Sequence, residues 1–240
     1  MTISTPVLSE RLTAVLAPYA PPIGISFHST TTELTRFNAS KPIATPDGRT
    51  GSVPAGCVFW MRAVDSLFAT VASDHANCSV GSFTHGLLSL EEAAQGDDVA
   101  TLLRSEWVAP EDFSRIAHVD QRPKEITYGP LDHYDQVADV VLLRINAKAL
   151  MLVHDAWPAL RIEGKPQCHI VALALESGTV AASVGCMLSR TRTGMGPEEL
   201  TLAIPGSILH EFLDALEKTT KVDSTVAAYA ARDSLRFSTP

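Results

Sequence analysis

The sequence predicts a mixed α/β (α+β) protein, a single compact domain in which helices flank a mixed sheet. Hydrophobic residues make up 45% of its 240 residues, enough to bury a full core in one large domain. Strand-like and helix-like segments follow one another along the chain, without the repeats of a solenoid or the heptads of a coiled coil. We expect one domain over residues 1–240, and a division into two lobes within 106–124 is the alternative.

The first half of the chain alternates short elements with polar turns. Helices are predicted over 9–16, 58–64, 91–105 and 111–116, and strands over 20–28 and 67–72. Residues 38–54 are rich in Pro, Gly, Ser and Thr, which is typical of a surface connection. The polar run 73–77 before Cys78 is a helix-start signal.

The second half is more regular. Strands are predicted over 125–128, 138–145, 179–184 and 200–204, and helices over 148–157, 170–176, 206–219 and 224–235. Ile208, Leu209, Phe212 and Leu216 form an apolar stripe along the third of these helices.

The charge of the chain bears on its partners. A net charge of −8 argues against a nucleic-acid or anionic-membrane binder, whose affinity depends on a basic surface. The N-terminus lacks the pattern of a signal peptide, and no apolar run reaches the roughly 20 residues that span a bilayer. We expect a cytoplasmic protein with a small-molecule substrate, no nucleic acid or membrane partner, and a homo-oligomer as a compatible state.

The four cysteines constrain the chemistry most. They are Cys57, Cys78, Cys168 and Cys186, and no two of them form a Cys-x-x-Cys pair. Each is predicted to lie near a helix N-terminus, where free backbone N–H groups stabilise a thiolate. In a reducing compartment such cysteines indicate metal ligation, redox work or burial rather than disulfides. If the fold brings the four cysteines together, they would form an iron–sulfur site. The alternative is that they are ordinary cysteines packed in the core.

Several segments together resemble a known family. They are Gly56-Cys57-Val-Phe-Trp-Met-Arg-Ala63, Asn77-Cys78-Ser-Val-Gly81 with Gly86, Gln167-Cys168, Gly185-Cys186-Met-Leu-Ser-Arg190 and Glu198-Glu-Leu-Thr-Leu-Ala-Ile-Pro205. In this order they resemble the domain of unknown function 169 family, also called the archaeal conserved region family. The resemblance runs from Pro21 to about Leu216, with all four family cysteine positions occupied, and residues 224–240 extend beyond it. The family's association with anaerobic archaea and bacteria implies iron–sulfur chemistry.

Other side chains are candidates for the same site. Arg190 and Arg192 follow Cys186 and precede a glycine turn, which suits a substrate carboxylate or phosphate or the charge of a cluster. His75, beside Asp74, is a candidate for moving protons, and His85 and His169 are weaker ones. No Walker loop, dinucleotide fingerprint or serine-nucleophile elbow is present.

These residues lead to one main functional hypothesis. Cys57, Cys78 and Cys186, with Cys168 as fourth ligand or free thiol, would hold an iron–sulfur cluster, with [4Fe–4S] favoured and zinc as the alternative. The cluster would serve a lyase, or a reductive lyase or hydrolase, in elimination, desulfuration or dehalogenation of a small polar or anionic molecule. His75 or Cys168 would handle protons, and Arg190 or Arg192 would bind the substrate. The alternative function is a non-catalytic metal-binding or thiol-redox-responsive protein.

Overall fold

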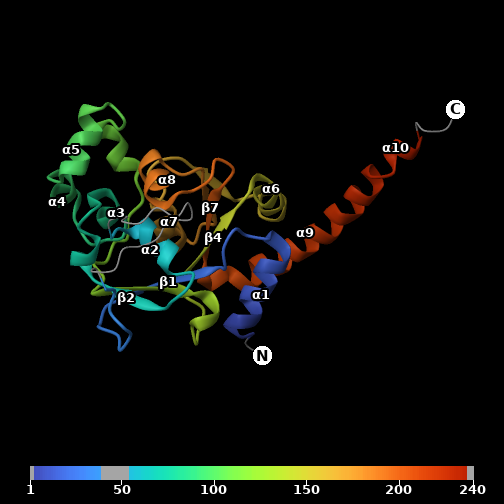
Figure 1. Cartoon of the computed structure of the whole chain (residues 1–240), viewed down its shortest axis with the longest axis horizontal. Coiled ribbons are helices and arrows are strands. Elements are labelled where there is room, and N and C mark those ends of the chain that lie inside the picture. Colours follow the sequence, from blue (N-terminus) through green and yellow to red (C-terminus); the bar gives the residue numbers. More distant parts are fainter. Residues whose placement is uncertain (1–2, 39–53, 237–240) are drawn as a thin grey trace.

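A mixed sheet of seven strands forms the middle layer of the part of the chain that the structure describes (Figure 1). This structure is a computed structural model, and it describes residues 3–38 and 54–236. The strand order is β2-β3-β1-β4-β7-β6-β5, and every neighbouring pair is antiparallel except β5 and β6. The strands are β1 (Ile23–His28), β2 (Phe68–Thr70), β3 (Glu125–Pro130), β4 (Val140–Ile145), β5 (Arg161–Glu163), β6 (Ala181–Ser183) and β7 (Leu200–Pro205).

The central strand β4 shows why helices cover both faces of the sheet. Its side chains alternate between the two faces. Val140 and Leu142 belong to the core on one face, and Val141, Leu143 and Ile145 belong to the core on the other. Because both sets are apolar, each face has to be covered by helices to exclude water.

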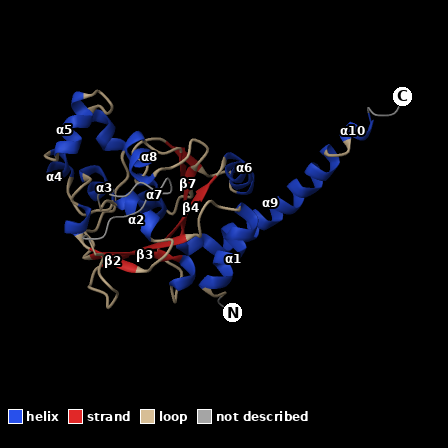
Figure 2. Ribbon diagram, viewed as in Figure 1, coloured by secondary structure: helices blue, strands red, loops and turns tan. Residues whose placement is uncertain are grey.

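The helices divide between these two faces (Figure 2). The first core is covered by α2 (Gly56–Arg62) and α7 (His169–Ser177), and α8 (Met187–Thr193) packs on α2. The second core is covered by α1 (Thr5–Leu16), α6 (Ala147–Ala156) and α9 (Leu209–Ala230). The shorter elements are η1 (Ala72–His75), α3 (Ser79–Thr84), α4 (Leu90–Ala94), α5 (Asp97–Arg104), η2 (Pro110–Arg115), η3 (Leu131–His133), η4 (Gly206–Ile208) and α10 (Asp233–Arg236).

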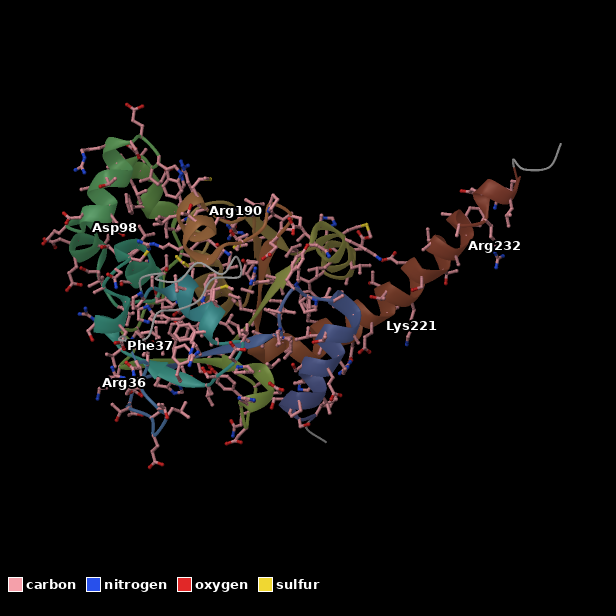
Figure 3. The ribbon with its side chains drawn as sticks, in the orientation of Figure 1. Arg36, Phe37, Asp98, Arg190, Lys221 and Arg232 are labelled. Atoms are coloured by element: carbon pink, nitrogen blue, oxygen red, sulfur yellow. The ribbon has the colours of Figure 1, made fainter. Side chains whose placement is uncertain are left out.

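Helix α9 is the longest element and projects from the body of the protein, and Figure 3 labels Lys221 on its outer part and Arg232 just beyond its end. Its buried residues, Leu209, Phe212, Leu213 and Leu216, all lie in its first half. The prediction of two helices over 206–219 and 224–235 is therefore wrong in one respect, because a single helix crosses residues 220–223. None of its 22 residues is Gly or Pro, so nothing in the backbone interrupts it.

The predicted fold class, a mixed sheet flanked by helices, is confirmed. Besides α9, two parts of the chain differ from the predicted elements. The single helix expected over 91–105 is two helices, since Gln95 ends α4 and Gly96, with an extended backbone, begins α5. Strand β5 was not predicted, because its residues are largely exposed and carry no apolar alternation. The surface connection predicted over 38–54 lies, for residues 39–53, outside the described part of the chain. Among the described residues, no helix has the length and hydrophobicity to cross a membrane.

Candidate functional site

All four cysteines line one cavity. It lies between α2, α3, α8 and the start of α7, and its free volume is about 30 Å³. Cys57, Cys78 and Cys168 are each 8% exposed, and Cys186 is partly exposed. Segments separated by more than a hundred residues of sequence thus meet at a single point. The other described lining residues are Gly56, Val80, Gly81, Leu102, Trp107, Pro166, Gln167, Leu188, Ser189 and Arg192.

Each cysteine stands at the start of a helix. Cys57 is the second residue of α2, and the other three are the N-cap residues of α3, α7 and α8. The prediction that each lies near a helix N-terminus is therefore confirmed. The first backbone N–H groups of a helix have no partner within the helix, so the four sulfurs are placed where such donors are available.

Two of the sulfurs already accept backbone hydrogen bonds. The N–H of Gly81 donates to the sulfur of Cys78 at 3.4 Å, and the N–H of Ser189 donates to the sulfur of Cys186 at 3.4 Å. Hydrogen bonds of this kind stabilise a thiolate and tune the potential of a metal bound to it.

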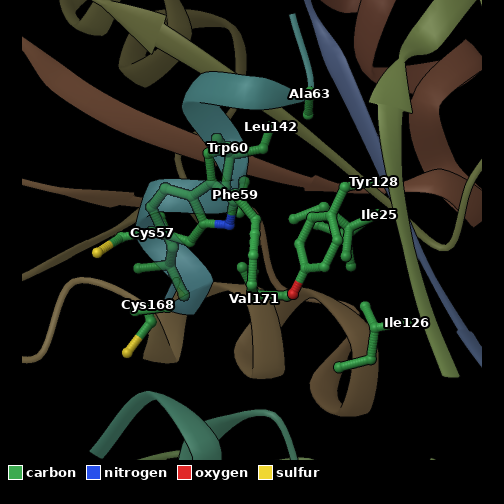
Figure 4. Close-up of a cluster of buried hydrophobic side chains, with 14 of the residues drawn as sticks. Ile25, Cys57, Phe59, Trp60, Ala63, Ile126, Tyr128, Leu142, Cys168 and Val171 are labelled. Atoms are coloured by element: carbon green, nitrogen blue, oxygen red, sulfur yellow. The ribbon is translucent and has the colours of Figure 1, made fainter. Parts of the chain in front are cut away.

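Burial opposes ionisation of three of the thiols. It raises the pKa of Cys57, Cys78 and Cys168, and the neighbouring cysteines raise the pKa of Cys57 and Cys168 further. In the metal-free protein these three side chains are therefore thiols at neutral pH. Figure 4 shows the sulfurs of Cys57 and Cys168 pointing to the same side, away from the aromatic cluster that contains Tyr128.

The two predicted arginines have different surroundings. Arg192 lines the cavity, donates to the backbone oxygen of Asn77 at 3.1 Å, and its positive charge lowers the pKa of Cys57 and Cys78 against the larger effect of burial. Arg190, labelled in Figure 3, is not among the described residues that line the cavity. Its guanidinium donates to the backbone oxygens of Val184, Gly196 and Glu199 at 2.6 to 3.1 Å. The hydrogen bonds of Arg190 thus connect the two ends of segment 184–199, which contains α8.

A network of buried side-chain hydrogen bonds lies at the cavity wall. The sequence analysis did not predict this network. Gln167, 1% exposed, accepts a hydrogen bond from the hydroxyl of Ser189 and donates to the hydroxyl of Thr201. The network connects the segment before Cys168 to the helix that follows Cys186. A hydroxyl three residues after an N-cap position is a capping pattern, and this signal was present in Cys186-Met-Leu-Ser189.

The predicted proton-transfer residue His75 is not among the described residues that line the cavity. Its ring is fully buried, with the ring centroid of Phe59 at 4.8 Å, of His85 at 5.9 Å and of Tyr128 at 6.1 Å. His85 packs against the start of α2: a Cβ on Gly56, the residue before Cys57, would be 3.1 Å from its Cε1. His169 is buried beside Cys168, with its Nε2 3.5 Å from a carboxylate oxygen of Glu163.

In residues 3–38 and 54–236, no three His, Cys, Asp or Glu side chains are arranged so that they could hold a metal ion. The donor set of the cavity nevertheless has the chemical type that iron–sulfur clusters take, four cysteine sulfurs around one space.

The fold and the site together define an α+β protein built around a four-cysteine cavity. The chain belongs to the DUF169 family, described as uncharacterised ArCR, whose model matches residues 11–215. The suspected resemblance to this family is therefore confirmed. A search of the curated proteins and a search of the solved structures found no match.

Proposed function

We propose that Cys57, Cys78, Cys168 and Cys186 form the binding site of an iron–sulfur cluster, with [4Fe–4S] favoured. The observation that supports this proposal is that the four cysteines of the chain all line one cavity, although they come from four separate segments. Ordinary core cysteines have no reason to gather in this way, since a free cysteine packs like any small hydrophobic residue.

Cysteine sulfur is the ligand type of iron–sulfur clusters, and all four cysteines line the cavity. A zinc ion takes the same ligand type, at about 2.3 Å. Metal analysis distinguishes zinc, which is the alternative, from a cluster.

The surrounding residues would serve a cluster in three ways. The N–H groups of Gly81 and Ser189 donate to two of the sulfurs, and the charge of Arg192 offsets the negative charge of the thiolates. Leu102, Trp107 and Leu188 line the cavity with apolar surface and limit the access of water. Apolar surroundings and N–H···S bonds are the protein's means of tuning such a centre.

We further propose that the protein is an enzyme acting on a small polar or anionic molecule. When bound, the cluster would supply a Lewis-acidic iron or an electron donor for elimination, desulfuration or dehalogenation. Arg192 would hold the acidic group of the substrate, because its guanidinium is already at the cavity wall. Cys168, if it is not a ligand, would carry a proton there, because its raised pKa keeps it protonated at neutral pH. The net charge of −8 supports a small-molecule partner in the cytoplasm and no nucleic acid.

A thiol-redox function has less support. The attacking species in disulfide exchange is the thiolate, and burial keeps Cys57, Cys78 and Cys168 in the thiol form. Bound metal reverses this balance, since thiolate ligands lose their protons to it.

Reconstitution of single-cysteine variants tests the proposal. Iron and sulfide are measured after anaerobic reconstitution of the wild type and of Cys57→Ala, Cys78→Ala, Cys168→Ala and Cys186→Ala. Ser89→Ala is the control, because it removes an N-cap side chain from α4, none of whose residues is among the described residues that line the cavity. We expect full loading of the wild type and the control and loss of cluster in the Cys57, Cys78 and Cys186 variants. If Cys168→Ala is the one cysteine variant that retains a cluster, the cluster has three cysteine ligands and Cys168 is a free thiol. Equal iron in all five variants, or zinc in place of iron, would contradict the proposal.

A further inference from the structure

Three buried polar side chains form a cluster of rings next to α2. His75, His85 and Tyr128 are each 0% exposed, and their rings are neighbours, with centroids 5.9 Å apart for the two histidines and 6.1 Å apart for His75 and Tyr128. Within residues 3–38 and 54–236, each of them has one polar atom without a hydrogen-bond partner: Nδ1 of His75, Nε2 of His85 and the hydroxyl oxygen of Tyr128. A buried polar atom without a partner is costly, so three of them in one cluster indicate a bound group.

The proton position on His85 follows from its partner. Its Nδ1 lies 2.8 Å from the backbone oxygen of Gly81. A carbonyl oxygen only accepts, so Nδ1 must carry the hydrogen. Burial lowers the pKa of His85 to about 4, and the ring is therefore neutral at pH 7. Its Nε2 is then a bare acceptor.

The proton position on His75 follows from its contact with Thr70. The Nε2 of His75 lies 3.0 Å from the hydroxyl oxygen of Thr70, and that hydroxyl donates its only hydrogen to the backbone oxygen of Ile126 at 3.0 Å. Nε2 must therefore be the donor to Thr70, which leaves Nδ1 as a bare acceptor. Burial lowers the pKa of His75 well below its usual value, so this ring is neutral as well.

The three polar atoms define the hydrogen-bonding pattern of the group that they would bind. It must donate two hydrogens, one to each imidazole nitrogen, and accept one from the phenol of Tyr128. It must also be small and neutral, because the surrounding rings of Phe59 and Phe68 provide no counter-charge. Water has this pattern of donors and acceptor, and buried waters typically make about three such bonds.

We propose that His75, His85 and Tyr128 form a binding site for one buried water molecule beside α2, the helix that carries Cys57. The ring of His85 packs against Gly56, which lines the cavity, and the ring centroids of Tyr128 and Phe59 are 5.6 Å apart. A water held there would link the three side chains into one hydrogen-bonded cluster. The binding of this water does not depend on the proposed function.

A crystal structure at high resolution and imidazole ¹⁵N NMR of the metal-free protein test the site directly. We expect one water at about 2.7–3.0 Å from each of the three polar atoms. We also expect the Nδ1–H form of His85 and the Nε2–H form of His75. An empty site, a metal ion in place of the water, or the opposite form of either histidine would overturn the proposal. None of these results depends on whether the cavity binds a cluster, so the two proposals fail separately.

The substitution Tyr128→Phe provides a second test. If the phenol donates to a bound water, its removal lowers the unfolding midpoint by roughly 2–4 °C. If the hydroxyl has no partner, its removal leaves the midpoint unchanged or raises it, and this result would contradict the water site. Tyr134→Phe is the matched control, because the hydroxyl of Tyr134 donates to the backbone oxygen of Gly24 at 3.0 Å and its loss must lower the midpoint in either case.

Discussion

Cys186 and Ser189 form two reciprocal hydrogen bonds at the start of α8. The N–H of Cys186 donates to the hydroxyl oxygen of Ser189 at 3.2 Å, and the N–H of Ser189 donates to the sulfur of Cys186 at 3.4 Å. The same hydroxyl donates to Gln167, the residue before Cys168. The side chain of Ser189 therefore connects Cys186 to the residue that precedes Cys168.

The first prediction concerns this serine. Ser189→Ala removes the acceptor of the Cys186 N–H and the donor to the buried Gln167, so we expect the free energy of unfolding to fall by about 1–3 kcal/mol. Urea denaturation measures this loss. Ser89→Ala, the same chemical change at the exposed cap of α4, should cost less. If the two variants lose the same stability, the network around Gln167 contributes nothing beyond an ordinary cap.

The second prediction uses the close approach of Gly56 to His85. In Gly56→Ala the new methyl group would lie 3.1 Å from Cε1 of His85, inside a buried cluster that has little freedom to move. We expect a loss of about 1–3 kcal/mol in the free energy of unfolding. Gly164→Ala is the control, since a Cβ there has no atom within 4 Å. The control should be neutral or stabilising by up to about 1 kcal/mol. Equal behaviour of the two variants would show that His85 does not pack against α2 as described.

The third prediction concerns pH. The pKa of His85 is lowered from 6.5 to about 4 in the folded protein, because burial disfavours the charged ring. Between these two values the unfolded chain binds a proton that the folded protein does not, so stability falls as the pH is lowered from about 6.5 to about 4. Over these roughly 2.5 pH units, His85 alone accounts for about 3 kcal/mol.

Urea denaturation across this pH range checks the third prediction. In His85→Asn, whose amide can still donate to the Gly81 oxygen, the decline in stability towards pH 4 should be shallower than in the wild type. The exposed His154, changed to Asn, should leave the slope as it is. An unchanged slope in His85→Asn would mean that this ring is not buried in its neutral form.

The fourth prediction isolates the charge of Arg192. In Arg192→Met the pKa of the Cys57 and Cys78 thiols should rise, because the guanidinium that favours their thiolates is gone. The midpoint of the pH dependence of cysteine alkylation in the metal-free protein, followed for each residue by mass spectrometry, reports the shift. Lys221→Met removes the same charge from the projecting part of α9. Midpoints that agree between the two variants would rule out an electrostatic role of Arg192 at the cavity.

The sequence predicted part of this site and could not predict the rest. The position of each cysteine at a helix start was accessible, because helix-start signals are local: a polar run precedes Cys78, and glycines or prolines lie close before the other three. The sequence could not show that Cys57 and Cys186 lie at the same cavity, because this depends on how α2 and α8 pack together. The proton positions on His75 and His85 depend on Thr70 and on the Gly81 oxygen, and so they too appear only in the folded protein. Local sequence similarly suggested a break in α9 after its apolar stripe, where the helix in fact continues into solvent.

The most direct test of the central claim is an ultraviolet–visible spectrum of the wild-type protein purified without oxygen, with iron, sulfide and zinc assayed on the same sample. If the four cysteines bind a cluster, the protein is brown, with broad visible absorption from sulfur-to-iron charge transfer and matching amounts of iron and sulfide. A colourless protein that contains no iron, and that takes up neither iron nor sulfide on reconstitution, would contradict it.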